Sequence, residues 1–251
     1  MKTLKIFPDV DSLARNAAEQ FVKVAVSAIT KRSRFAVALS GGATPQKMYS
    51  LLATEAFSSK LAWEYVHIFW CDERCVPPGH RDSNFGLVQK LLLKHIPLPP
   101  DNIHRIRGEN EPKKAAIQYE QELQSFFIMH NKRRGVAPGE FTPNFDLILL
   151  GLGEDGHTAS LFPGTAALRA RRRWVIANEV DTLNDWRITL TPVIINMAAH
   201  ILFLVSGRKK ANPLQQVLYG QYLPTLLPSQ LIKPVNGRLL WMVDEAAAAM
   251  L

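Results

Sequence analysis

The chain has 251 residues, of which 47% are hydrophobic and 21% charged, a globular composition that allows a sizeable core. The N-terminal segment has charges and a proline where a signal peptide has its apolar centre, and no run of about 18 apolar residues occurs, so we expect a cytoplasmic protein without a membrane span. The net charge of +8 is compatible with nucleic acid, an acidic membrane surface or a small anionic substrate.

Apolar runs of strand length alternate with helical patterns along the chain. We predict strands over residues 4–7, 35–39, 66–70, 145–150, 174–177, 186–191, 200–205 and 238–243, and a short strand-like piece at 103–106. Apolar residues at helical spacing predict helices over 10–29, 45–52, 85–92, 112–126 and 192–199, and a further helix after Lys210 that continues to Leu218. Asp9 or Asp11 is the expected N-cap of the first helix, and Pro45 suits the first turn of the second.

This alternation, with about seven or eight strands, predicts one α/β domain over residues 1–251. We expect a three-layer, Rossmann-like architecture in which helices flank a mostly parallel, mixed sheet. The alternation of Arg187 to Thr191 favours a half-exposed, antiparallel strand in that sheet. Ligands of open α/β sheets bind outside the carboxyl ends of the strands, so polar residues that follow strands are the candidates for a site.

The segment after the strand at 145–150 contains the densest group of such residues. The buried strand breaks there into glycines and groups that can move protons: Gly151, Gly153, Glu154, Asp155, Gly156 and His157. Residues 158–162 are expected to form a helical turn, which Pro163 and Gly164 end. His157 is the only one of the seven histidines that lies in a glycine-rich strand exit between acids.

Other strand ends supply candidates for anion binding. Backbone N–H groups of Gly41 and Gly42, before a helix N-terminus, suit a phosphate or an oxyanion, although Gly-Gly before a helix is often only a tight turn. Arginine binds phosphate through paired N–H donors. The remaining candidates are Arg74, Ser83, Asn84, Arg187, Arg208 and Lys209. For Ser83 and Asn84, helix capping is an equally good interpretation.

The basic residues and the cysteines exclude other kinds of site. Basic clusters occur at 31–34, 132–134, 169–173 and 208–210, mostly in predicted loops, and no helix-turn-helix, finger or aromatic-studded basic strand accompanies them, so we expect no nucleic acid partner. Cys71 and Cys75 have no second cysteine pair to complete a metal site, and we predict reduced, partly buried thiols.

Six motifs together resemble the 6-phosphogluconolactonases. They are SGGATP at 40–45, WCDERCVPP at 70–78, SN at 83–84, GLGEDGHTASLFPGT at 151–165, RITLT at 187–191 and SGRKK at 206–210. The motifs follow the family's order and span nearly the whole chain, and the block at 151–165 is the most specific. The resemblance implies hydrolysis of 6-phosphoglucono-1,5-lactone to 6-phosphogluconate in the oxidative pentose phosphate pathway.

The resemblance also implies the fold shared with glucosamine-6-phosphate deaminases and isomerases. In that sister group the corresponding block continues to a run that supplies a carboxylate, whereas residues 160–164 here contain no acid. The deaminases also tend to have a tyrosine where this chain has Arg74. Both departures favour the lactonase.

The sequence therefore predicts lactone hydrolysis by water that His157 activates. A histidine can both accept and return a proton near neutral pH, and no metal or other cofactor is needed. We expect Glu154 or Asp155 to orient His157 or to hold sugar hydroxyls, and Arg74, Lys209 and Arg187, with Arg208 less central, to bind the phosphate. The partner is a small sugar-phosphate lactone, and we expect a monomer. The alternatives are an amino-sugar phosphate isomerase or deaminase, a non-catalytic sugar-phosphate sensor and a basic nucleic-acid binder.

Overall fold

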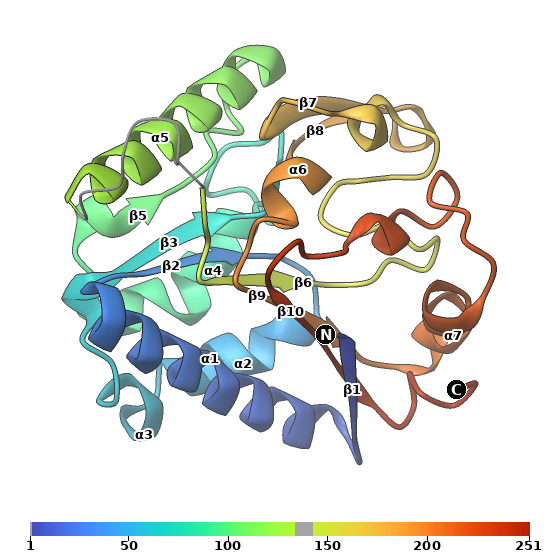
Figure 1. Ribbon diagram of the computed structural model, residues 1–251, viewed down its shortest axis with the longest axis horizontal. Helices are drawn as coiled ribbons and strands as arrows, with labels where there is room; N and C mark the ends of the chain where they lie inside the picture. The colour runs from blue at the N-terminus through green and yellow to red at the C-terminus, as the bar shows by residue number, and fades with distance from the viewer. Residues whose placement is uncertain (1, 134–142) are drawn as a thin grey trace.

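The computed structural model, which describes residues 2–133 and 143–251, is built on a seven-stranded sheet (Figure 1). The strand order is β1-β10-β9-β6-β2-β3-β5, and all neighbouring strands are parallel. The bounds are β1 (Lys2–Phe7), β2 (Phe35–Leu39), β3 (Val66–Trp70), β5 (Ile103–His104), β6 (Leu147–Leu150), β9 (His200–Val205) and β10 (Arg238–Asp244). The central strands β2 and β6 are buried along their whole length, which explains their unbroken apolar sequences.

A second, antiparallel sheet contains β4 (Asp72–Arg74), β8 (Asp185–Leu190) and β7 (Val175–Val180) in that order. The chain passes from one sheet to the other at Cys71, whose N–H donates to the Leu39 carbonyl and whose carbonyl accepts from the Leu190 N–H. The predicted antiparallel strand at 186–191 is therefore confirmed as β8. It belongs to this smaller sheet, so the main sheet is parallel throughout rather than mixed.

Helices cover both faces of the main sheet. Figure 1 shows α1 and α2 on one face and α5 on the other, with β7 and β8 near α5 and α6. The bounds are α1 (Val10–Arg32), α2 (Thr44–Leu52), α3 (Glu55–Ser58), α4 (Asn84–Leu91), α5 (Pro112–Arg133), α6 (Pro192–Ile195) and α7 (Ala211–Tyr219). Asp9 caps α1 by accepting from the Ser12 N–H, and Pro45 lies in the first turn of α2, as predicted. No helix in the described ranges is long and apolar enough to cross a membrane.

Besides the composition of the sheet, further sequence-based predictions differ from the structure. The helix predicted over 192–199 ends at Ile195, as α6. Residues 158–162 do not form a helical turn: Thr158 and Leu161 pair in an antiparallel bridge, and Ala159 takes a left-handed conformation with φ of 47°. The helical prediction was wrong because the buried polar contacts of Ser160, described below, hold this turn. The strand-like piece at 103–106 is reduced to β5, and the predicted loop at 132–143 lies mostly outside the described residues.

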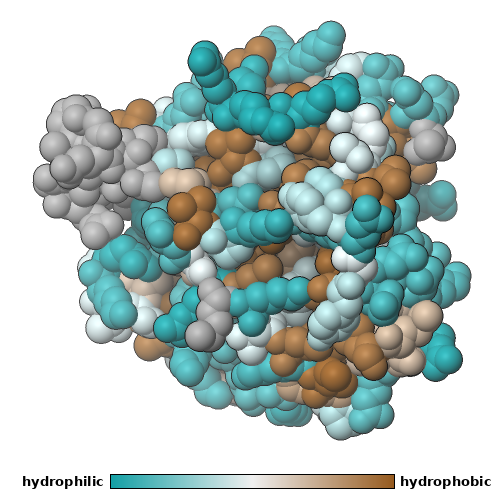
Figure 2. Space-filling view, turned by 45° about the vertical axis from the view of Figure 1, so that its right-hand side comes forward, coloured by the Kyte–Doolittle hydropathy of each residue, from teal (hydrophilic) through white to brown (hydrophobic). Residues whose placement is uncertain are grey.

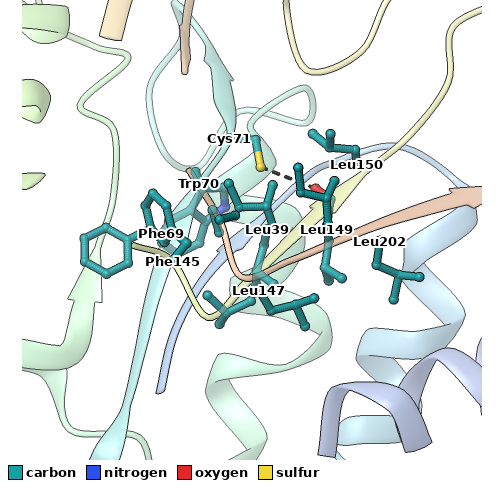
Figure 3. Close-up of a cluster of buried hydrophobic side chains, with 14 of the residues drawn as sticks. Leu39, Phe69, Trp70, Cys71, Phe145, Leu147, Leu149, Leu150 and Leu202 are labelled. Carbon is teal, nitrogen blue, oxygen red and sulfur yellow. Dashed lines mark hydrogen bonds between the residues drawn. The ribbon is translucent and has the colours of Figure 1, made fainter. Parts of the chain in front are cut away.

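A hydrophobic cluster lies beneath the carboxyl ends of β2, β3 and β6. Figure 3 shows Leu39, Trp70, Leu149 and their neighbours, and the thiol of Cys71 donates to the Leu149 carbonyl at 3.3 Å. Burial raises the pKa of the Cys71 thiol far above its ordinary value, and that of Cys75 to about 11. Both cysteines are free thiols, Cys71 buried and Cys75 half-buried, as predicted. On the face drawn in Figure 2, hydrophilic side chains predominate and hydrophobic ones gather in smaller areas.

Candidate active site

A cleft of about 650 Å³ opens at the carboxyl ends of the central strands. Strands β2 and β6 are neighbours, and from this pair the strand order runs outward in opposite directions, through β3 to β5 and through β9 to β10. The connections that leave such a pair diverge and create a crevice, which is where ligands of open α/β sheets bind. The loops after β2, β3, β6 and β9 line the cleft, together with Leu183 and Arg187 from the second sheet and its hairpin.

The loop after β6 holds a histidine and a carboxylate in direct contact. Nδ1 of His157 lies 2.5 Å from Oδ1 of Asp155, and the backbone N–H of His157 donates to the same oxygen at 3.1 Å. The carboxylate therefore fixes the imidazole relative to its own backbone. Because Nδ1 carries the hydrogen in this pairing, Nε2 is the nitrogen that can accept a proton.

Glycines make this loop tight enough to bring the two side chains together. The Gly153 N–H donates to the His157 carbonyl at 2.8 Å, and the Gly156 N–H donates to the Gly153 carbonyl at 3.2 Å. Gly156 has a φ of +79°, which few other residues adopt. A Cβ on Gly153 would lie only 2.1 Å from Nδ1 of His157, so the imidazole occupies the space that a side chain would need.

The surroundings keep the Asp155 carboxyl ionised. Partial burial by itself raises its pKa, but the hydrogen bonds from His157 and the electrostatic interaction with that residue together lower the pKa below its ordinary value. The His157 ring also packs against Phe162, with ring centroids 4.3 Å apart. Asp155 and Phe162 thus restrict the imidazole from two directions.

The loop after β2 supplies backbone donors. Ser40 to Pro45 line the cleft, and no described side chain caps the first turn of α2. Pro45 has no N–H group and the Gln46 N–H donates to the Ala43 carbonyl at 3.4 Å, so the donors that this loop can offer a ligand precede Pro45. Gly42 has a φ of +91°. Oγ1 of Thr44 lies 2.9 Å from Oγ of Ser206, which joins this loop to the one after β9. The arrangement suits an anion at the positive end of a helix.

Two arginines lie directly opposite each other on neighbouring strands of the second sheet. Arg74 on β4 pairs in register with Arg187 on β8, and both line the cleft. Arg74 donates from Nη1 to the Asp82 carbonyl at 2.9 Å, while its buried Nε has no hydrogen-bond partner among the described residues. Arg187 forms an ion pair with Asp185. Like charges directly opposite on a sheet are destabilising, and an anion between them relieves the repulsion.

Buried polar groups support the floor of the cleft. Oδ2 of Asp72 accepts from Oγ of Ser160 at 2.6 Å, and Nδ2 of Asn84 donates to the Asp72 carbonyl at 2.9 Å. Ser160 is held further by Thr189, whose hydroxyl accepts its N–H. Gly41 packs so closely that a Cβ there would lie 1.8 Å from Oδ1 of Asn84. These contacts fix the loops after β2, β3 and β6 relative to one another.

Glu73 organises the start of α4 and explains the position of Ser83. Its carboxylate accepts from the N–H groups of Asn84 and Phe85 and from the Ser83 hydroxyl. Burial raises the pKa of Glu73, and these backbone donors lower it by less. The Ser83 hydroxyl itself accepts from the Gly86 N–H, so Ser83 is the N-cap of α4. Of the two interpretations of Ser83, the structure supports capping.

The cleft contains most, but not all, of the predicted site residues. Those that line it are Gly41, Gly42, Arg74, Asn84, Glu154, Asp155, His157 and Arg187. Ser83 is buried away from the lining, and Arg208 and Lys209 are exposed and do not line it. Lys210, from the same turn, lines the cleft instead. Glu154 is exposed, and it is Asp155 that contacts the imidazole.

Five further polar residues line the cleft that the sequence pattern did not single out: Thr44, Asp72, Ser160, Ser206 and Lys210. A signal existed for Asp72, because it follows β3 as directly as Arg74 does. No such signal exists for Ser160, which enters the cleft only because residues 158–161 form a bridged turn.

The amino-acid sequence is similar to those of known proteins. The sequence model of the "Glucosamine-6-phosphate isomerases/6-phosphogluconolactonase" family matches residues 8–241. A 6-phosphogluconolactonase of Nostoc sp. is 40% identical over 251 residues, which cover 100% of this chain and 98% of that protein. One from Haemophilus influenzae is 39% identical over 215 residues, covering 86% and 87%.

Solved structures agree with these relatives. A protein called devB superposes with a TM-score of 0.88 at 33% identity and covers all of both chains. The 6-phosphogluconolactonase from Trypanosoma cruzi superposes with a TM-score of 0.84 at 26% identity, covering 100% of this chain and 97% of the other. A monomeric glucosamine-6-phosphate deaminase, at 18% identity and a TM-score of 0.79, shares the fold.

Proposed function

The chain belongs to the glucosamine-6-phosphate isomerase/6-phosphogluconolactonase family, and from that membership we propose that it hydrolyses 6-phosphoglucono-1,5-lactone to 6-phosphogluconate. The observation that carries the proposal is the contact between Asp155 and His157 in a cleft that three cations also line. The proposal includes a cytoplasmic, monomeric enzyme.

His157 acts as base and then as acid. Asp155 holds Nδ1, so Nε2 takes a proton from water as the oxygen of that water attacks the lactone carbonyl. The tetrahedral intermediate carries its negative charge on the former carbonyl oxygen, where backbone N–H groups stabilise it. As the bond between the carbonyl carbon and the ring oxygen breaks, the imidazolium returns the proton to that oxygen. The products are a hydroxyl group and a carboxylic acid, which releases its proton to solvent and becomes the carboxylate.

The phosphate binds at the cationic part of the cleft. Arg74, Arg187 and Lys210 line it from three different elements, and the loop that precedes Pro45 adds backbone donors. Arginine can bind phosphate through two N–H groups at once, and both Arg74 and Arg187 line the cleft. Binding of the phosphate positions the lactone ring beside His157, and it does not itself make the carbonyl more reactive.

The first test is a coupled assay on enzymatically generated lactone. Following 6-phosphogluconate with and without protein separates catalysis from spontaneous ring opening. We expect His157→Ala to lower kcat by about a hundredfold or more, because the group that carries both proton steps is gone. His95→Ala, which changes an exposed histidine outside the cleft lining, is the matched control and should retain full activity. Wild-type rates in the His157 variant would contradict the mechanism.

Isomerisation or deamination of an amino-sugar phosphate is the alternative within the family. That chemistry needs an additional carboxylate base, and residues 160–164 contain none. Incubation with glucosamine 6-phosphate should therefore release no ammonia, and release at an enzymatic rate would replace the lactonase proposal.

A further inference from the structure

The peptide bond between Gly156 and His157 is held by hydrogen bonds on both of its sides. Its N–H donates to Asp155, as described above. Its carbonyl oxygen accepts two hydrogen bonds from Ser229, one from the backbone N–H at 3.0 Å and one from Oγ at 2.8 Å. Ser229 is only 2% exposed, so these hydrogen bonds are shielded from bulk water. The low local dielectric of the interior makes them stronger than they would be in water.

The segment that contains Ser229 also contacts the loop after β6 at other points. Leu227 packs on Gly156 so closely that a Cβ on that glycine would lie 2.7 Å from Cδ2 of Leu227. Further along, the Gly164 N–H donates to the Thr225 carbonyl at 2.9 Å. Gly156 has no side chain of its own to resist rotation of the adjoining peptide, so these external contacts determine the orientation of that peptide.

We propose that Ser229 is a positioning residue for His157. Its hydroxyl holds the Gly156 carbonyl, and so keeps the N–H of the same peptide directed at the Asp155 oxygen that also accepts from Nδ1. Hydrogen bonds in such a chain polarise one another, so a donor at the carbonyl strengthens the N–H as a donor. Without the hydroxyl the peptide rotates more freely, and the imidazole samples orientations in which Nε2 does not face the substrate. This inference rests on the proposed role of His157.

Asn196 provides a control on the same segment. Its Nδ2 donates to the Leu231 carbonyl at 2.9 Å, and its Oδ1 accepts from the Lys233 N–H at 2.7 Å. Asn196 therefore ties the segment to the end of α6, and it does not line the cleft. Asn196→Ala removes two side-chain hydrogen bonds to the same segment without touching the Gly156 carbonyl.

The experiment compares Ser229→Ala with Asn196→Ala in kcat, KM, thermal unfolding and the ¹⁵N spectrum of the imidazole. We expect Ser229→Ala to lower kcat about tenfold with KM within about twofold, since one hydrogen bond to the reacting arrangement is lost. We also expect its His157 signals to move from the Nδ1–H tautomer toward a mixture of tautomers. Asn196→Ala should lower the unfolding temperature and leave kcat and the tautomer unchanged. Ser229→Cys keeps a side chain of similar size with a weaker donor, and should lie between wild type and Ser229→Ala.

Two results would overturn the inference: an unchanged kcat in Ser229→Ala, or equal losses in both alanine variants with an unchanged tautomer. The second would mean that Ser229 only stabilises the fold. If wild-type protein does not accelerate lactone opening, the proposed function fails, but the tautomer comparison still decides whether Ser229 positions the imidazole.

Discussion

At Gly153, the side chains of His157 and Asp155 occupy the space that a Cβ would need. A Cβ there would lie 2.1 Å from Nδ1 of His157 and 2.6 Å from Oδ1 of Asp155. Both are ends of side chains that can move, so Gly153→Ala should cost little stability but separate the pair. We expect kcat to fall about a hundredfold. The control is Gly79→Ala, where an added Cβ meets no atom of the described residues within 4 Å. A fully active Gly153→Ala enzyme would show that the contact is dispensable.

The lowered pKa of Asp155 makes a prediction about stability in acid. An acid whose pKa is lower in the folded state stabilises that state above its unfolded pKa of about 4, and this contribution disappears as the pH falls through the folded pKa. Asp155 is half exposed, so its contribution is small. Thermal unfolding of wild type and Asp155→Asn should therefore differ by about a degree at pH ~6 and coincide by pH ~2. If the difference in unfolding temperature became larger as the pH falls, the pKa of Asp155 would be raised in the folded state, not lowered.

The turn after β9 determines which lysine reaches the ligand. Arg208–Lys210 form one turn of 3₁₀-helix after Gly207, whose φ is +94° and whose N–H donates to the Asp244 carboxylate. Because Lys210 lines the cleft and Lys209 is exposed, Lys210→Ala should raise KM about tenfold and Lys209→Ala by less than about twofold. The reverse result would favour the residue that the sequence motif suggested.

This turn also illustrates what a sequence can predict. The apolar runs predicted the buried strands, because a strand covered on both faces needs continuous hydrophobic residues. The glycines and acids after β6 identified the loop that contains Asp155 and His157. The sequence could not distinguish Lys209 from Lys210, since consecutive residues of a 3₁₀ turn point about 120° apart and the direction depends on Gly207. The turn at 158–161 was wrongly predicted because distant residues, Asp72 and Thr189, hold Ser160.

The whole molecule carries a net charge of +8 and presents three cations in one cleft. Such a field attracts a phosphorylated substrate, and added salt screens it. Raising the ionic strength from about 0.05 to about 0.5 M should lower kcat/KM for the phosphorylated lactone several-fold. Glucono-1,5-lactone, without the phosphate, is the control and should respond much less. An equal decrease of kcat/KM for both lactones would show that the salt effect does not act through the substrate phosphate.

The pairing of β1 with β10 has a consequence for how the protein reaches its native state. These strands come from opposite ends of the chain, yet they are hydrogen-bonded neighbours along their full length. During synthesis β1 therefore emerges long before β10, its one neighbour among the described strands, and stays unpaired while the other strands of the sheet are made. Contacts between residues so far apart in sequence make folding slow, and the unpaired edge of a strand is prone to aggregation until its partner forms. Formation of β10 thus completes the sheet and provides the partner of β1.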